Sequence, residues 1–194
     1  QRQMCIRDSY FDITKQLMPG KKNTLAVRLE NLPESSRWYP GAGLYRNVHV
    51  IVTENAHIPV WGTYVTTPTA TKEFAKVNVR TQIVLLEGAD AGKYSVKTSV
   101  WNPNGQKLTE QTIPLSQIKY NDNSLSQEFI IQTPTLWSPD MPALYSAETR
   151  LYEGDQLKDI YTTPFGIRSI EIIPNKGFFL NGEKTVFKLS LIHI

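Results

Sequence analysis

Apolar and polar residues alternate along most of the chain with a period of two. Between residues 24 and 30, Leu25, Val27 and Leu29 alternate with Ala, Arg and Glu. The segment Asn47–Thr53 repeats this pattern with three valines. A period of two places successive side chains on opposite faces, which is typical of a half-buried β-strand. No window of about 12 residues has a convincing helical stripe, so the pattern predicts an all-β chain.

The middle of the chain carries the longest alternating runs. One face of a long predicted strand holds Ala75, Val77, Val79, Thr81, Ile83 and Leu85. Further strands are predicted around Tyr94–Val100, at Phe129 and Ile131, and over Leu144–Tyr152. Turn residues follow at 102–105, 153–155 and 180–183. Strands separated by such turns predict a sandwich, and residues 58–168 have the length of one immunoglobulin-like domain of ~100 residues.

Composition and charge exclude several classes of function. The chain has 194 residues, of which 40% are hydrophobic and 20% are charged, and its net charge is +3. A charge this small, carried by scattered Lys and Arg, does not predict nucleic-acid binding. No apolar run reaches the ~20 residues of a membrane-spanning helix. Cys5 is the only cysteine of the sequence, which excludes an internal disulfide framework.

Five segments, in order along the chain, resemble the family-2 glycoside hydrolases, and most closely their bacterial β-galactosidase-like members. They are Tyr10–Thr14 with Asn23–Glu30, Ser36–Val50, Leu136–Tyr145 (LWSPDMPALY), Phe165–Glu171 (FGIRSIE) and Gly177–Lys188 (GFFLNGEKTVFK). The resemblance implies the end of a sugar-binding-type jelly roll over residues 10–56 and an immunoglobulin-like β-sandwich over 57–172. Residues 173–188 would be the opening hairpin of a catalytic (β/α)8 barrel. We expect residues 1–9 and 189–194 to be non-native ends.

The resemblance implies a retaining mechanism, in which two glutamates of the barrel flank the scissile glycosidic bond. None of Glu128, Glu148, Glu171 and Glu183 lies in a matching motif. The chain is therefore expected to hold no catalytic residue, and to be the non-catalytic N-terminal portion of an enzyme that hydrolyses terminal β-galactosides. Neither a metal-ligand cluster nor a cofactor motif is present in the sequence.

One candidate sugar contact precedes the Gly-Leu-Tyr-Arg step of the second segment. In related enzymes this loop reaches towards the active site, and here it contains Arg37, Trp38 and Tyr39. Arg37 stands where some β-galactosidases have an acidic residue, which weakens the expected preference for galactose. We expect a purely structural role at the domain junctions for Gly41, Gly43, Arg46, Trp137 and Arg168.

Other functions remain open at this point. β-Glucuronidases and β-mannosidases share the family, and a free-standing carbohydrate-binding module or an immunoglobulin-like spacer is the alternative outside it. The expected partner is an oligosaccharide bound through the barrel, with no nucleic acid and no membrane, and an oligomer is possible for the full-length enzyme. The bacterial resemblance favours the periplasm slightly over the cytoplasm.

Overall fold

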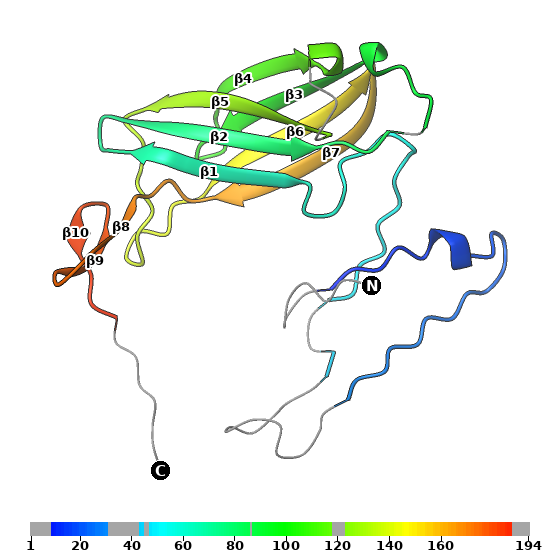
Figure 1. The fold of residues 1–194 in the computed structure, drawn as a ribbon, viewed down its shortest axis with the longest axis horizontal. Helices are drawn as coiled ribbons and strands as arrows, with labels where there is room; N and C mark the ends of the chain where they lie inside the picture. Colours follow the sequence, from blue (N-terminus) through cyan, green and yellow to red (C-terminus); the bar gives the residue numbers. More distant parts are fainter. Residues whose placement is uncertain (1–8, 31–42, 45–46, 86, 118–122, 188–194) are drawn as a thin grey trace. The chain divides into compact units, whose positions relative to one another are not determined.

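The computed structural model describes residues 9–30, 43–44, 47–85, 87–117 and 123–187 (Figure 1). The chain divides into two units, residues 1–52 and residues 53–194. Of the ends that were expected to be non-native, 1–9 and 189–194, all residues except Ser9 lie outside the described residues.

The described part of the first unit contains one short 3-10 helix, η1 (Thr14–Gln16). Side-chain bonds order the chain near it, since Asp12 Oδ1 accepts from Thr14 N at 2.9 Å and Asn23 Oδ1 accepts from Met18 N at 2.9 Å. The strands predicted at Thr24–Glu30 and Asn47–Thr53 are absent from the described structure, so this prediction was wrong.

The physical reason is the lack of a pairing strand. A β-strand needs a neighbour that accepts and donates its backbone hydrogen bonds. Among the described residues neither segment has such a neighbour, and the apolar side chains that the pattern predicted to be buried are exposed. Leu25 is 64% exposed, Val50 79% and Val52 88%.

The second unit holds two antiparallel sheets that lie one over the other in Figure 1. The three-stranded sheet has the order β1 (Thr63–Ala70), β2 (Phe74–Gln82) and β5 (Ser124–Gln132). The four-stranded sheet has the order β4 (Lys107–Pro114), β3 (Tyr94–Trp101), β6 (Tyr145–Glu153) and β7 (Gln156–Phe165). Two 3-10 turns, η2 (Ala91–Lys93) and η3 (Leu115–Gln117), flank β3 and β4. The prediction of an all-β chain with a sandwich is confirmed.

A third, small sheet follows the sandwich. Its order is β10 (Glu183–Lys184), β9 (Gly177–Leu180) and β8 (Ile170–Ile173). Asn181 and Gly182 form the tight turn between β9 and β10, with φ of 53° and 81°. Asn and Gly adopt this left-handed conformation more readily than other residues, so the predicted Asn-Gly hairpin is confirmed.

The interior of the sandwich contains two apolar clusters. The first consists of Ala75, Val77, Val79, Val100, Phe129, Ile131, Tyr145, Ala147, Phe165 and Ile167. The second consists of Ala56, Ile58, Ile83, Val96, Leu115, Leu125 and Leu151. Both sheets contribute to each cluster, which is what holds the sheets face to face.

A layer of buried polar side chains separates the two clusters. The inward-facing residue that lies between the two clusters is Thr98 on β3, Gln127 on β5 and Thr149 on β6. Gln127 Oε1 accepts from Thr98 Oγ1 at 2.6 Å, and Gln127 Nε2 donates to the carbonyl of Gln111 at 2.9 Å. The Oγ1 atoms of Thr98 and Thr149 are 3.2 Å apart. These bonds offset the cost of burying polar groups and join β5 to the opposite sheet.

Candidate functional site

Most of the residues predicted to contact sugar or the first domain junction cannot be placed. Arg37, Trp38, Tyr39, Gly41 and Arg46 lie outside the described residues. Gly43 is described and exposed, and a Cβ atom added to it would meet no atom within 4 Å. The structural role expected for Gly43 stays a prediction, because residues 41–42 and 45–46 beside it lie outside the described residues.

Trp137 and Arg168 come together where the sandwich ends. Trp137 N donates to the carbonyl of Ile167 at 2.7 Å, and the Arg168 guanidinium carbon lies 4.7 Å from the centre of the Trp137 ring. This distance is within the range of a cation–π interaction. Between these contacts, a Cβ atom on Gly166 would lie only 2.8 Å from Trp137 Cβ. Only glycine allows the chain after β7 to pass this close to the indole.

Asn181 joins the small sheet to the same place. Its side-chain Nδ2 donates to the carbonyl of Trp137 at 3.0 Å, and its Oδ1 accepts from Ser169 N at 3.0 Å. The backbone of Asn181 also donates to the carbonyl of Ser169 at 2.9 Å. The sequence indicated Asn181 only as a turn residue, because its second role depends on Trp137, 44 positions away.

A hollow of ≈ 600 Å³ lies beside this junction. It is lined by Val65, Thr67, Trp137, Leu144, Pro164, Phe165, Gly166, Arg168 and Ile170. Thr67 Oγ1 donates to the carbonyl of Arg168 at 2.9 Å. Arg168 is the one charged residue of this lining, and no carboxyl group takes part in it. Glycoside hydrolysis needs two carboxyl groups, so the hollow lacks the groups for that reaction.

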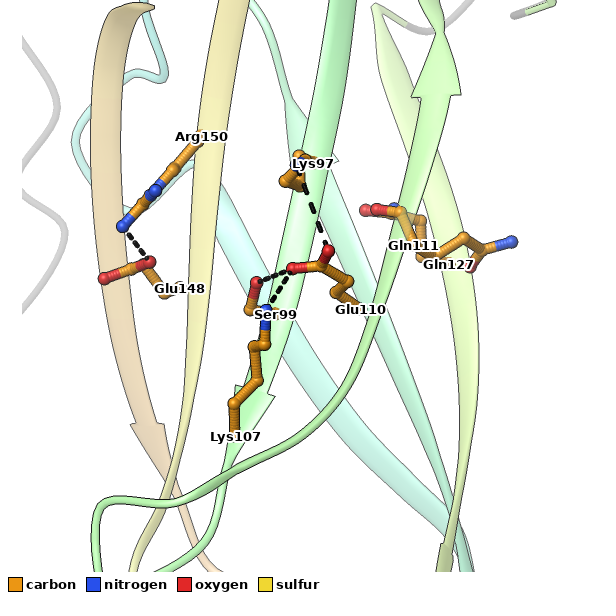
Figure 2. Close-up of polar contacts among 8 residues, drawn as sticks. All are labelled: Lys97, Ser99, Lys107, Glu110, Gln111, Gln127, Glu148 and Arg150. Carbon is orange, nitrogen blue, oxygen red and sulfur yellow. Dashed lines mark hydrogen bonds and ion pairs between the residues drawn. The ribbon is translucent and has the colours of Figure 1, made fainter.

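Two carboxylates do lie near each other on the outer face of the four-stranded sheet (Figure 2). Glu110 on β4 and Glu148 on β6 are both in register with Ser99 on β3. Glu110 pairs with Lys107 at 2.9 Å and with Lys97 at 3.9 Å, and Glu148 pairs with Arg150 at 2.8 Å. Each carboxylate therefore has a cation of its own beside it.

The electrostatics of this face do not suit acid–base catalysis. The hydrogen bond from Lys107, followed by the one from Ser99, lowers the pKa of the Glu110 carboxyl below its ordinary value. A glycosidase needs one carboxyl group whose pKa is raised, so that it can donate a proton. Two strand spacings of ~4.8 Å also separate the backbones of Glu110 and Glu148. We interpret this face as a solvated surface with ion pairs.

The described part of the chain shows neither a metal-ligand group nor a membrane-spanning helix. The described residues contain no group of three or more His, Cys, Asp and Glu side chains that could hold a metal ion. Among the same residues, no helix has the length and apolarity needed to cross a membrane.

Comparison with known proteins gives consistent results. The family model described as glycosyl hydrolases family 2 matches residues 56–168. A beta-galactosidase of Bacteroides ovatus is 35% identical over 184 residues, which are 94% of this chain and 22% of that protein. A beta-glucuronidase of Formosa agariphila is 27% identical over 195 residues, covering 90% of this chain and 20% of the relative.

A solved structure supports the same relationship. The crystal structure of a beta-glycosidase from Bacteroides vulgatus superimposes with a TM-score of 0.64 and 30% sequence identity, over 77% of this chain and 18% of that one. The chain thus spans about a fifth of the length of the relatives named here. Because the family model covers more than half of its 194 residues, the chain belongs to glycosyl hydrolases family 2.

Proposed function

We propose that this chain is the non-catalytic, β-rich N-terminal portion of a retaining β-glycosidase that hydrolyses terminal β-galactosides. The observation that carries the proposal is the family match over residues 56–168, combined with 35% identity to a beta-galactosidase along 94% of the chain. In this proposal residues 10–56 end a jelly roll, residues 57–172 form the immunoglobulin-like sandwich, and residues 173–188 open the catalytic barrel.

The chemistry would then take place in the barrel, outside this chain. A retaining glycosidase places its two carboxyl groups ~5–5.5 Å apart across the scissile bond. Glu110 and Glu148, the neighbouring carboxylates described above, are each paired with cations and do not meet this requirement. The chain would contribute to the site through Arg37, Trp38 and Tyr39, with the aromatic rings stacking on a sugar ring.

The junction of Trp137, Gly166, Arg168 and Asn181 would then serve the barrel mechanically. It joins the sandwich to the small sheet through the cation–π contact and the two Asn181 side-chain bonds. A rigid joint here would keep the opening hairpin of the barrel in a fixed position on the sandwich. Such positioning is what a catalytic site at the end of barrel strands requires.

A β-glucuronide is the second candidate substrate. The observation that favours it is Arg37, which replaces an acidic residue in the candidate sugar-contact loop. A guanidinium matches the planar geometry of a carboxylate, and a glucuronide carries a carboxylate that a galactoside lacks. The named relatives include both a beta-galactosidase and a beta-glucuronidase.

The first experiment assays the 194-residue chain with chromogenic β-galactoside and β-glucuronide substrates. We expect no turnover above a matched blank, because the chain would lack both catalytic glutamates. Turnover of either substrate would overturn the non-catalytic role. A free-standing carbohydrate-binding module would instead bind galacto-oligosaccharides without cleaving them, which calorimetry on the same sample would detect.

The second experiment assays the complete gene product with the same two substrates. The proposal expects β-galactoside hydrolysis with retention of configuration. A kcat/KM higher for the β-glucuronide, together with its loss in the Arg37→Ala variant, would establish the second candidate. Arg80→Ala, which changes an exposed arginine of β2, serves as the matched control, because Arg80 lies outside both the candidate contact loop and the junction.

A further inference from the structure

The second unit begins with a segment, residues 54–62, that belongs to neither sheet but is packed as firmly as a strand. Ala56 and Ile58 are buried members of the second apolar cluster, at 6% and 3% exposure. In the structure this segment leads into β1. We call residues 54–62 the strap.

Backbone hydrogen bonds tie the strap to the three-stranded sheet. His57 N donates to the carbonyl of Val84 at 3.0 Å, and Val84 N donates to the carbonyl of His57 at 2.9 Å. This pair forms an isolated antiparallel bridge two residues beyond β2. At the other end of the strap, Gln82 N donates to the carbonyl of Gly62 at 2.7 Å.

Side chains of β7 tie the same strap to the four-stranded sheet. Asp159 Oδ2 accepts from Ile58 N at 2.8 Å, and the Tyr161 hydroxyl accepts from Trp61 N at 3.1 Å. Lys158 Nζ lies 3.3 Å from Glu54 Oε2 and 3.1 Å from Glu153 Oε2. The strap therefore bridges both sheets, because its backbone bonds one of them and three nearly consecutive residues of β7 hold it to the other.

The environment of Lys158 keeps its side chain charged. Its side chain is only 13% exposed and lies between two carboxylates. The hydrogen bond with Glu153 and the bond with Glu54 raise the pKa of the Lys158 ammonium above its ordinary value. The Glu54 side chain is 59% exposed, so solvent weakens its ion pair with Lys158.

Trp61 supplies independent evidence that the strap is held firmly. Its φ of 58° lies in the left-handed region, which costs a bulky residue roughly 1–3 kcal/mol. The adjacent bond from Gly62 N to the carbonyl of Pro59, at 2.7 Å, closes the turn around Trp61. Such strain persists only where surrounding contacts over-determine the backbone, as Tyr161 and Gln82 do here.

We propose that the strap is a rigid element of the second unit whose position on the sandwich is set by Lys158, Asp159 and Tyr161. The three β7 residues are positioning residues, because they act through the strap. The inference goes beyond the glycosidase proposal and does not depend on which sugar the enzyme cleaves. It means that the firmly held part of the second unit begins before β1.

Amide hydrogen exchange on the full 194-residue chain tests the strap. In the unaltered chain we expect residues 56–62 to exchange as slowly as the edge strands β1 and β7. Tyr161→Phe removes the acceptor of the Trp61 amide and should speed its exchange roughly 2- to 12-fold, the effect of losing one hydrogen bond. Tyr64→Phe, an exposed tyrosine of β1, is the matched control and should leave the strap unchanged.

A second pair of variants separates positioning from general stability. Lys158→Met keeps the apolar stem but removes the charge, and should speed exchange at residues 54–58 while amides of β2, β3 and β5 keep their protection. Lys107→Met removes a comparable ion pair on β4 and should not affect the strap. Lys158→Arg should restore slow exchange, because a guanidinium can also bond both carboxylates.

Three outcomes would overturn the proposal. The first is that residues 54–62 exchange as fast as residues 24–30 in the unaltered chain. The second is that neither Tyr161→Phe nor Lys158→Met changes exchange in the strap more than its control variant does. The third is that either variant lowers protection equally in the strap and in the central strands. Tyr161 and Lys158 would then stabilise the whole fold and not the strap in particular.

Discussion

Residues 24–30 and strand β3 share an alternating pattern, but their apolar side chains end in opposite environments. Leu25 in the first segment is 64% exposed, whereas Val96 and Val100 in β3 are fully buried. β3 pairs with β4 on one side and β6 on the other, and the opposite sheet covers its inner face. Residues 24–30 have no paired strand among the described residues. Alternation therefore specifies which side chains are to be buried, and pairing decides whether they are.

The largest expected effect separates the two regions physically. Residues 53–194, produced alone, should unfold in one cooperative thermal transition, because both apolar clusters lie within them. Residues 1–52 alone should show no cooperative transition, since unpaired strand segments bury too little apolar area and aggregate readily. Circular dichroism on both fragments measures this contrast. A cooperative melt of residues 1–52 would break the comparison.

Removing one leucine from each region sharpens the contrast. Leu151→Ala should destabilise the sandwich by about 2–5 kcal/mol, because it opens a cavity in the second cluster. Leu25→Ala removes the same atoms from an exposed site and should change the stability by no more than about 0.5 kcal/mol. Denaturant unfolding of the full chain measures both values. Similar losses would mean that Leu25 is buried in solution.

Glycine to alanine changes give a smaller difference of the same kind. Gly166→Ala places a methyl group 2.8 Å from Trp137 and should cost about 1–3 kcal/mol through overpacking. Gly43→Ala meets no neighbouring atom and should be close to neutral. Denaturant unfolding followed by tryptophan fluorescence measures both changes. A neutral Gly166→Ala would show that the indole moves aside freely.

The smallest expected effect is a loss of stability in alkali. Burial, and then the charge of Glu153, raises the pKa of Tyr94, and the pKa of Lys158 is raised as well. The folded state therefore holds these protons more tightly than the unfolded state. This stabilisation is complete below about pH 10 and is lost as the pH rises through the folded pKa values.

Thermal melts between pH 8 and pH 11.5 measure this loss. Lys158→Met should flatten the decline of the melting temperature, whereas Lys107→Met should keep it. Equal declines in all three proteins would assign the alkaline loss to other groups. Tyr94 and Lys158 both lie in the sandwich, so this alkaline loss belongs to the second unit.

The sequence predicted the sandwich well because its central strands carry strict alternation. The inward positions predicted from Ala75 to Ile83 are buried as expected. Strand β1 was not predicted, since its four threonines and one proline, on a sheet edge, interrupt the alternation of apolar and polar residues. The strap was missed for another reason. Its contacts with Asp159 and Tyr161 lie about 100 positions away, where no local pattern reports them.

The junction shows the same limit at the level of single residues. The motif around Trp137 and Arg168 was recognised from family resemblance, but their direct contact was not. Gly166 and Asn181 complete that contact through backbone approach and side-chain bonds. Distances between remote segments decide such roles, and periodicity carries no information about them.

The buried polar layer also sets how the sandwich responds to temperature. Exposing apolar surface on unfolding raises the heat capacity, whereas exposing polar surface lowers it. Thr98, Gln127 and Thr149 occupy interior positions that an ordinary sandwich fills with aliphatic side chains. The heat-capacity change on unfolding is therefore smaller than for an aliphatic core of the same size. A smaller change gives a flatter stability curve, so this sandwich loses less stability on cooling.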